Sequence, residues 1–228
     1  MPSPRILIVT AVAAERDAVL SGLERGGVSS GVEVLASGVG PAAAAAGTAT
    51  ALTSAALGGA PFGVAVSAGI AGGFGQPLGG AVVATSIVAA DLGAVTSGPD
   101  GDGPEGFASV EELGFGKAEH RPPPDLVRAA AEAAQAARGP VLTVSTVTGT
   151  HARARELTAR HPGAAAEAME GFGVAEAAAA HGVPVLELRT VSNAVGPRDR
   201  AAWRIPEALE ALGAGCAAVL PVLRAWGA

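Results

Sequence analysis

Residue types that build disulfides, metal centres and nucleic-acid interfaces are scarce in this chain. Its single cysteine, Cys216, excludes an internal disulfide, and its four histidines show no metal-ligand spacing. The formal net charge is −6 and no basic run is present, which argues against a nucleic-acid partner. Charged residues or glycine clusters interrupt every apolar run, and the amino terminus lacks a signal-peptide pattern. We therefore expect a cytoplasmic protein without a metal, a nucleic-acid partner or a membrane anchor.

Aromatic residues are also few, at 3% of the chain. Hydrophobic residues nevertheless reach 49% of the 228 positions, and the mean hydropathy is +0.40, so the chain can bury a sizeable core. That core must consist of Val, Leu, Ile and Ala in closely approaching layers, which favours helices lying on a sheet. We expect a single domain over residues 1–228.

Short β-rich runs alternate with longer helical stretches along the chain. The predicted strands are Ile6–Ala11, Val32–Ala36, Gly63–Val66, Ala81–Val88, Val141–Thr146 and Val183–Val191. The predicted helices are Ala13–Arg25, Pro41–Leu57, Pro124–Ala137, His151–Arg160, Gly171–Ala180 and Ile205–Trp226. This alternation predicts a three-layer α/β/α fold with a central mixed, mostly parallel sheet.

Two segments are harder to interpret. The alanine content of Gly163–Met169 favours a helix, whereas its position just before Glu170 favours a strand, and we predict a strand. Leu92–Arg121 has no clear periodicity and is rich in Gly, Pro, Asp and Glu. Structureless segments of that length are uncommon inside a domain, so we expect a long functional loop or flap.

Polar residues at strand ends mark the candidate site. Ligands of open α/β sheets bind beyond the carboxyl ends of the strands. Glu15 follows the first predicted strand, Glu170 follows the ambiguous strand, and Asn193 follows the last. Each also has an ordinary explanation, because acidic residues suit the first turn of a helix and asparagine suits loops.

Five short segments carry a resemblance to a known family. They are Thr10-Ala-Val-Ala-Ala-Glu-Arg-Asp, Ser37-Gly-Val-Gly-Pro, Ser67-Ala-Gly-Ile-Ala-Gly-Gly, Glu167-Ala-Met-Glu and Arg189-Thr-Val-Ser-Asn-Ala-Val-Gly. In this order and spacing they resemble the nucleoside phosphorylase and methylthioadenosine nucleosidase superfamily over nearly the whole chain. The Met-Glu and Ser-Asn pieces are moderately specific, and the glycine pieces alone are weak. The run Gly196-Pro-Arg-Asp-Arg-Ala-Ala-Trp resembles the corresponding loop of the futalosine hydrolase family within it.

The resemblance implies an N-ribosyl hydrolase that cleaves a purine nucleoside without a cofactor. In such enzymes the residue at Glu15 holds or deprotonates the attacking water, and Glu170 contacts the ribose hydroxyls. Met169 would lie against the apolar face of the sugar, unless it is an ordinary core residue. The family also forms homodimers or larger homo-oligomers. The water and sugar region would be lined by groups of Gly38, Ser67, Ala68 and Gly69.

Asn193 departs from the adenine-specific hydrolases of the family, which carry Asp at this position. A carboxyl group can donate a proton to N7 and accept from a 6-amino group, whereas an amide can direct its donor to N7 and O6. A polar site built for one pattern penalises the other. The departure therefore predicts a 6-oxopurine substrate, futalosine first. It also removes the usual proton donor, a role that Asp199 would take directly or through water.

The loop after Asn193 supplies candidates for the rest of the substrate. Futalosine is an inosine with a carboxyphenyl ketone at its 5′ end, so its site needs a cation beside apolar surface. Arg198 and Arg200 are candidates for O6 or for that carboxylate, and a salt-bridged surface turn is their alternative. Phe172 and Trp203 are candidates to stack on the ligand, with core packing as their alternative.

Phosphorolysis is a competing chemistry in the superfamily. No arginine occurs between Arg25 and Arg121, and Lys117 is the only lysine, so the glycine-rich loops lack a charged phosphate clamp. This pattern favours water as the nucleophile. An inosine or methylthioadenosine type of nucleosidase or phosphorylase, and a non-catalytic nucleoside-binding module, remain the alternatives.

Two other enzyme classes fail their own tests. Gly38-Val-Gly-Pro-Ala-Ala partly matches a dinucleotide-binding fingerprint, but no acidic residue occurs between Glu33 and Asp91 to bind a ribose. Ala65-Val-Ser-Ala-Gly nearly matches the nucleophile elbow of esterases. None of the four histidines, however, sits in a convincing strand-end loop.

Overall fold

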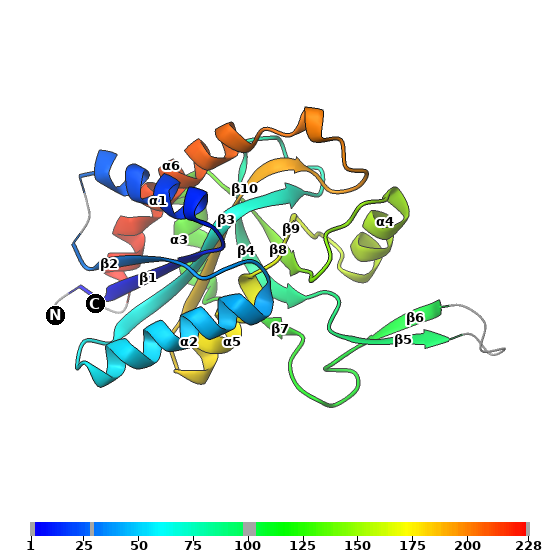
Figure 1. Ribbon diagram of the computed structural model, residues 1–228, viewed down its shortest axis with the longest axis horizontal. Coiled ribbons are helices and arrows are strands. Elements are labelled where there is room, and N and C mark those ends of the chain that lie inside the picture. Colours follow the sequence, from blue (N-terminus) through cyan, green and yellow to red (C-terminus); the bar gives the residue numbers. More distant parts are fainter. Residues whose placement is uncertain (1–2, 28–29, 98–103, 227–228) are drawn as a thin grey trace.

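The computed structural model describes residues 3–27, 30–97 and 104–226. Its main sheet has the strand order β10-β4-β8-β9-β3-β1-β2, and β7 pairs with β4 (Figure 1). The strands are β1 (Arg5–Thr10), β2 (Val32–Ala36), β3 (Phe62–Gly73), β4 (Ala81–Ala89), β7 (Glu119–His120), β8 (Ala137–Thr143), β9 (Ala166–Ala168) and β10 (Val185–Ala194).

The sheet is mixed and closes on itself. β1 pairs in parallel with β2 and β3, and β3 pairs in parallel with β10, whereas β4 and β9 are antiparallel to β10 and β3 respectively. Because β10 pairs with both β3 and β4, the strands β3, β10, β4, β8 and β9 form a closed ring. The predicted mixed, mostly parallel sheet is confirmed, but its closure was not predicted. Closure depends on pairings between strands that are far apart in the sequence.

Helices cover both sides of the sheet, as predicted. One side carries α1 (Ala13–Arg25), α3 (Pro124–Ala134) and α6 (Ile205–Ala225), which pack on one hydrophobic cluster. The other side carries α2 (Pro41–Leu57) and α5 (Gly171–Ala180), which pack on a second cluster. α4 (His151–Arg160) lies beside the edge of the sheet at which the parallel strands end (Figure 1).

Glycines let the helices of each layer approach closely. A Cβ atom on Gly22 of α1 would lie 2.1 Å from the carbonyl oxygen of Gly213 in α6. A Cβ on Gly173 of α5 would lie 2.0 Å from the carbonyl oxygen of Pro41 in α2. Both positions therefore exclude any side chain. This close approach lets a core with few aromatic residues reach normal packing density.

Helix α6 meets the length and composition requirements of a membrane span. Its apolar side chains, however, are buried against the rest of the protein: Leu212, Cys216, Leu220 and Leu223 are at most 1% exposed. They pack against α1, α3 and β10. α6 is therefore placed as a core helix.

Two strand predictions had wrong bounds. The strand predicted at Gly63–Val66 extends to Gly73, because its glycine-rich end pairs with both β9 and β10. The strand predicted at Val141–Thr146 begins earlier, at Ala137, after Gln135 ends α3 in a left-handed conformation (φ 50°), and ends earlier, at Thr143. The ambiguous segment Gly163–Met169 contains β9, so the predicted strand is confirmed. Long-range pairing overrides local preference in these places.

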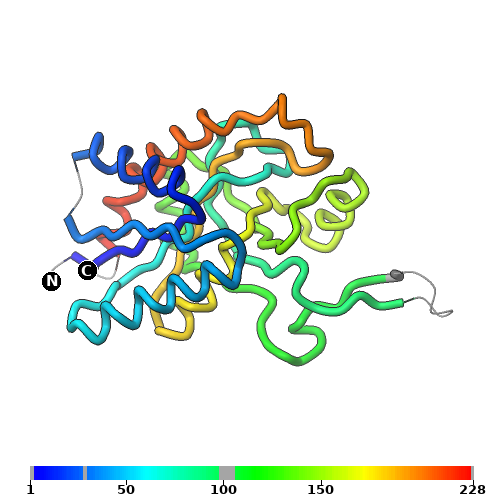
Figure 2. The backbone as a smooth tube through the Cα atoms, in the orientation of Figure 1, coloured from blue at the N-terminus to red at the C-terminus, as the bar shows by residue number. Residues whose placement is uncertain are grey.

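The prediction of a loop at Leu92–Arg121 was wrong for its first half. The segment contains a hairpin of β5 (Gly93–Ser97) and β6 (Pro104–Ser109), which projects from the body of the molecule (Figures 1 and 2). Residues 98–103 lie outside the described residues. In the hairpin, Val95 pairs with Phe107. Cross-strand pairing gives this segment a regular structure that its composition did not indicate.

Candidate active site

A cleft lies where the parallel strands β1, β3 and β10 end, next to β9 and the start of α5. It has a volume of about 230 Å³, and a smaller cavity of about 120 Å³ adjoins it. The two share the lining residues Gly72, Val147, Glu167, Asn193 and Trp203. Of the predicted site residues, the structure brings Glu15, Met169, Glu170 and Asn193 together in the cleft lining.

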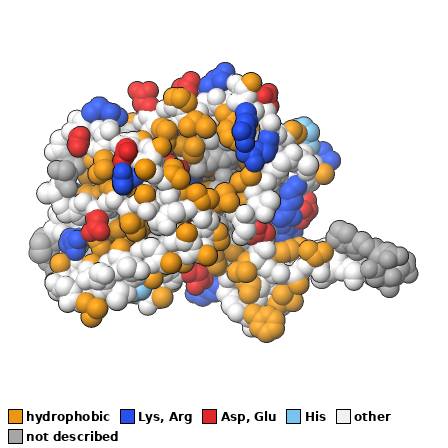
Figure 3. Space-filling view, viewed as in Figure 1, with side chains coloured by type: hydrophobic (Ala, Val, Ile, Leu, Met, Phe, Trp, Pro, Cys, Tyr) orange, Lys and Arg blue, Asp and Glu red, His pale blue; other side chains and the backbone are white. Residues whose placement is uncertain are grey.

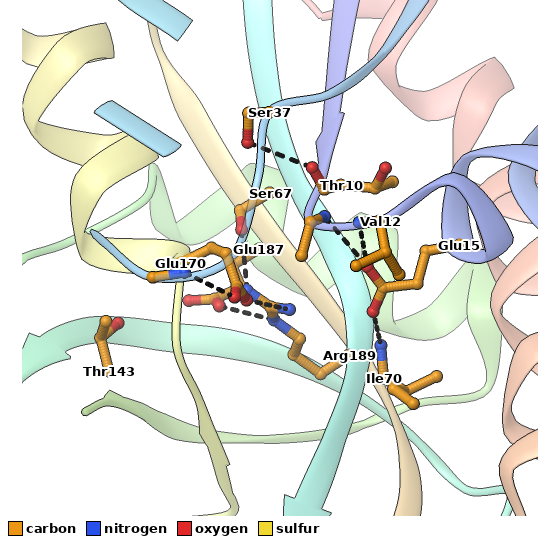
Figure 4. A network of polar contacts seen from close by, with 12 residues as sticks. Thr10, Val12, Glu15, Ser37, Ser67, Ile70, Thr143, Glu170, Glu187 and Arg189 are labelled. Carbon is orange, nitrogen blue, oxygen red and sulfur yellow. Dashed lines mark hydrogen bonds and ion pairs between the residues drawn. The ribbon is translucent and has the colours of Figure 1, made fainter. Parts of the chain in front are cut away.

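Glu15 is held by backbone groups of β3 and of the turn after β1. It lies in the first turn of α1 and is 4% exposed. Its Oε2 accepts hydrogen bonds from the backbone N–H groups of Ala11 (2.9 Å) and Val12 (3.3 Å), and its Oε1 accepts one from Ile70 (2.9 Å) (Figure 4). The carboxylate therefore has one orientation, at the end of both β1 and β3.

Glu170 is held by a buried arginine that the sequence analysis did not select. Arg189, on β10, is 1% exposed. Its Nη1 donates to Glu170 Oε2 (3.2 Å), its Nε to Glu187 Oε1 (2.8 Å), and its Nη2 to Ser67 Oγ (3.0 Å) (Figure 4). Gly40 N donates to Glu170 Oε1 (3.2 Å). Both oxygens of Glu170 are thus fixed by donors from separate elements.

Burial and neighbouring charges shift the pKa values of Glu187 and Arg189 in this network. Burial raises the pKa of Glu187, and the facing Arg189 only partly opposes this effect. Burial alone would lower the pKa of Arg189, but the carboxylates of Glu187, Glu170 and Glu15 raise it overall. Among the described residues, Glu187 Oε2 has no hydrogen-bond partner. Arg189 is therefore a permanent cation surrounded by acids.

Gly69 lies between Glu15 and Arg189, the residue that holds Glu170. A Cβ atom on it would lie 2.6 Å from both Glu15 Oε1 and Arg189 Nη1, so only glycine fits between them. Gly38 needs glycine for another reason, because its φ is 103°. Gly38, Ser67, Ala68 and Gly69 were predicted to line the cleft. None of the four is among the residues that line it, and Ser67 instead accepts a hydrogen bond from Arg189.

The wall of the cleft next to the smaller cavity contains Asn193 and Glu167. Asn193 Nδ2 donates to the carbonyl oxygen of Ala194 (2.9 Å), and Asn193 Oδ1 accepts from Ser192 Oγ (2.8 Å). Glu167, on β9, is 6% exposed and accepts from Thr148, at Oε1 from its backbone N–H (2.8 Å) and at Oε2 from its Oγ (2.5 Å). Neighbouring backbone and hydroxyl groups therefore orient both side chains.

The loop after β10 places its residues unequally. Trp203 lines both cavities, and Arg198 lines the smaller one with its guanidinium 5.3 Å from the Trp203 ring centroid. Arg200 is 6.0 Å from the same centroid and lies outside both linings. Asp199 also lies outside them, because its carboxylate caps the 3-10 turn η1 (Arg200–Ala202) by accepting from Ala201 N (3.1 Å).

Phe172 is not placed to stack on a ligand. It is 7% exposed, belongs to the core cluster under α2 and α5, and packs against His120 with ring centroids 5.3 Å apart. Core packing, the alternative considered for this residue, is what the structure shows. None of the described residues of Leu92–Arg121 lines the cleft either.

Sequence reasoning missed three buried charges of the site: Glu167, Glu187 and Arg189. The last two alternate with leucines in β10, a strand whose pattern predicts burial. Charged residues in such a strand are rarely buried unless they are paired, which was the available signal. Glu167 carried no such signal, because the strand around it was itself ambiguous. The described residues contain no cluster of His, Cys, Asp or Glu that could hold a metal ion.

Comparisons with known proteins agree with this geometry. Residues 23–221 match the sequence profile of the phosphorylase superfamily. A futalosine hydrolase of Streptomyces coelicolor is 59% identical, with 97% of both chains covered. A futalosine hydrolase of Acidothermus cellulolyticus is 44% identical, with 92% of this chain and 88% of the relative covered.

Solved structures show the same fold at lower sequence identity. A 5′-methylthioadenosine/S-adenosylhomocysteine nucleosidase of Colwellia psychrerythraea, in complex with adenine, has a TM-score of 0.74 and 22% identity, covering 97% of this chain and 94% of that one. An S-adenosylhomocysteine nucleosidase of Streptococcus pyogenes has a TM-score of 0.76 and 19% identity, covering 98% of both chains. With the sequence relatives, these findings show that the chain belongs to the futalosine hydrolase family of the phosphorylase superfamily.

Proposed function

We propose that the protein hydrolyses the N-glycosidic bond of futalosine and releases hypoxanthine, as a step of menaquinone biosynthesis. The observation that carries this proposal is a cleft with two fixed carboxylates, Glu15 and Glu170, in a chain 59% identical to a futalosine hydrolase. Departure of the base leaves an oxocarbenium-like sugar, which nearby carboxylates stabilise. The fold provides these carboxylates without a cofactor.

Each carboxylate takes a separate role in this mechanism. Glu15, oriented by backbone N–H groups, accepts a proton from water directed at the anomeric carbon. Glu170 accepts hydrogen bonds from the ribose hydroxyls, and Arg189 orients it. Met169, which lines the cleft between them and the base side, packs against the sugar. Preorganised groups of this kind need no reorganisation as charge develops.

Asn193 holds the base. One hydrogen of its Nδ2 is directed to Ala194, and the second is available for O6 or N7 of a 6-oxopurine. An amide does not protonate the leaving base. Because Asp199 caps its own turn outside the cleft lining, we assign it a route through water. Arg198, at the smaller cavity, suits O6 rather than the distant 5′ carboxylate.

The cleft lining favours water over phosphate as the nucleophile. Among the residues that the structure describes, it contains three carboxylates, those of Glu15, Glu167 and Glu170, and no arginine or lysine. A phosphate ion there would face like charges without a clamp. The 5′ side suits an aromatic ketone, because Val12, Val39 and Ile205 line the cleft and are 37% to 56% exposed. Water and the neutral sugar fit between these carboxylates, and a phosphate ion does not.

The proposal includes a homo-oligomer in the cytoplasm. Leu113 and Phe115 are 40% and 81% exposed in the loop after β6, where Figure 3 shows hydrophobic side chains on the surface. Exposed apolar groups on a projecting segment are a common feature of subunit interfaces. Light scattering on the purified protein measures the mass directly, and a monomer at working concentration would remove this part of the proposal.

The proposed activity is tested by measuring free-base release from futalosine, inosine and 5′-methylthioadenosine, each with and without phosphate. We expect fast release of hypoxanthine from futalosine, independent of phosphate. Equal release from inosine would keep the enzyme class but remove the 5′ specificity. Release that requires phosphate would identify a phosphorylase. No release from any of the three would leave a binding protein.

A further inference from the structure

Glu167 occupies an unusual position in the cleft. It lines both the main cleft and the smaller cavity, together with Asn193. In the sheet, Gly72 of β3 is in register with Glu167 of β9 on one side and with Asn193 of β10 on the other. Side chains in register on adjacent strands point to the same face. Glu167 and Asn193 therefore flank Gly72 on a common face.

Gly72 lies between these two side chains. Adjacent strands are about 4.8 Å apart, so the backbones of β9 and β10 are separated by roughly 10 Å here. A Cβ atom on Gly72 would lie 2.9 Å from Val195 Cγ2 and 3.4 Å from Asn193 Nδ2, so these side chains already fill the space directly over Gly72. The room for a planar base is the adjoining cavity of about 120 Å³, which both Glu167 and Asn193 line.

The carboxylate of Glu167 has acceptor capacity left. Each oxygen accepts one hydrogen bond from Thr148, whereas a carboxylate offers about four acceptor sites. Within the described ranges, no arginine, lysine or histidine forms an ion pair with it. A buried anion with only neutral partners is stabilised by a further donor. The side of the cavity it faces is where such a donor would bind.

From these observations we infer that Glu167 reads the base by accepting the N1–H of the 6-oxopurine. This inference rests on the proposed function and adds a residue to it. Hypoxanthine has a donor at N1, whereas adenine has an acceptor there. Glu167 attracts the first and repels the second, while Asn193 donates to O6 or N7. The pair is complementary to hypoxanthine at both edges, so discrimination does not depend on Asn193 alone.

A purely structural role, tethering Thr148, makes different predictions. Glu167→Gln keeps the size of the side chain and an acceptor for Thr148 N, but its amide can present a donor to N1. Thr148→Val removes one tether and keeps the carboxylate. If Glu167 only tethers the loop, both variants lower turnover of every base to the same extent. If it reads N1–H, only the glutamine variant changes base preference.

The experiment measures kcat/KM for futalosine and for its adenine counterpart with the wild type and both variants. For Glu167→Gln we expect about a 10- to 100-fold loss with futalosine and an unchanged or raised value with the adenine substrate. For Thr148→Val we expect an unchanged ratio. Equal losses on both substrates with Glu167→Gln would overturn the inference.

A second measurement needs no variant. Binding of free hypoxanthine to the wild type is compared with binding of 1-methylhypoxanthine, which lacks the N1 hydrogen. We expect at least about 10-fold weaker binding of the methylated base. Equal binding would overturn the inference even if futalosine is cleaved. If the wild type releases no base from futalosine, the proposed function fails, but this binding comparison still tests Glu167.

Discussion

The two ends of the cleft, which the proposed function assigns to the sugar and to the base, hold their polar side chains by different means. At the sugar end, Glu170 is paired with Arg189, which is paired in turn with Glu187. At the base end, Glu167 and Asn193 bond only to hydroxyl and backbone groups. Ionic pairing therefore lies at the end where the proposed mechanism forms a cationic sugar. Hydrogen bonds to neutral groups lie at the end where the proposed mechanism recognises the base.

The difference has an energetic reason. Buried ions are costly unless each has a partner, and removing one partner exposes that cost. The sugar end accepts this cost because fixed charges stabilise a transition state more than the ground state. The base end discriminates between neutral bases, for which unsatisfied hydrogen bonds are sufficient. Substitutions at one end should therefore lower turnover or stability, whereas substitutions at the other should change base preference.

The largest effect is expected at Glu15. Glu15→Gln keeps an acceptor for the backbone donors but cannot take a proton, so kcat for futalosine should fall by roughly 100- to 10,000-fold. Binding of hypoxanthine should be unchanged, because the base lies at the other end. Base-release kinetics and equilibrium binding measure the two. The control is Asp17→Asn, an exposed position on the same helix, and near-normal turnover of Glu15→Gln would remove its assigned role.

A comparable loss, in stability rather than turnover, is expected at Arg189. Arg189→Met leaves Glu187 and Glu170 without their cation and should lower the free energy of unfolding by about 3 to 5 kcal/mol. The double variant with Glu187→Gln should recover part of that loss, because one of the unpaired acids is gone. Urea unfolding measures both. A double variant as unstable as the sum of its parts would show that the two residues are not coupled.

A smaller effect is expected at the base end. Asn193→Asp introduces a group that can donate to N7 and accept from a 6-amino group, so preference should shift toward adenine nucleosides by about 10- to 100-fold. Stability should change little, because the position is partly exposed. The measurement is kcat/KM on matched hypoxanthine and adenine substrates. An unchanged base preference would show that residues other than Asn193 discriminate between the bases.

The smallest effect concerns pH. Because burial raises the pKa of Glu187 above its ordinary value of 4.5, the folded protein binds a proton that the unfolded chain has lost. This residue therefore makes stability fall as pH rises from 4.5 to its folded pKa, by at most about 1.4 kcal/mol per pH unit. Glu187→Gln should remove that slope relative to the wild type. Identical pH profiles would contradict the perturbed pKa, and the exposed Glu156→Gln is the control.

Local sequence signals predicted the regular elements well and the site in part. α1, α2, α4 and α5 have the predicted bounds, because prolines, glycines and caps mark their ends. Glu15 and Glu170 follow β1 and β9, and Asn193 lies near the end of β10, so position relative to the strands brought them together. Glu187 and Arg189 were missed because Arg189 joins Glu187 of its own strand to Glu170 at the start of α5. No local pattern indicates which buried charges meet.

The amino-acid sequence by itself determined the layered α/β architecture, the family and the residues that begin each helix, because these depend on periodicity, turn residues and short motifs. Tertiary structure alone decided that the sheet closes through β10, that Gly69 lies between Glu15 and Arg189, and that Glu167 faces Asn193 across Gly72. It also moved Phe172 into the core and Asp199 out of the cleft. The physical reason is that contacts between distant segments depend on strand order and register, which are settled only when all the layers pack together.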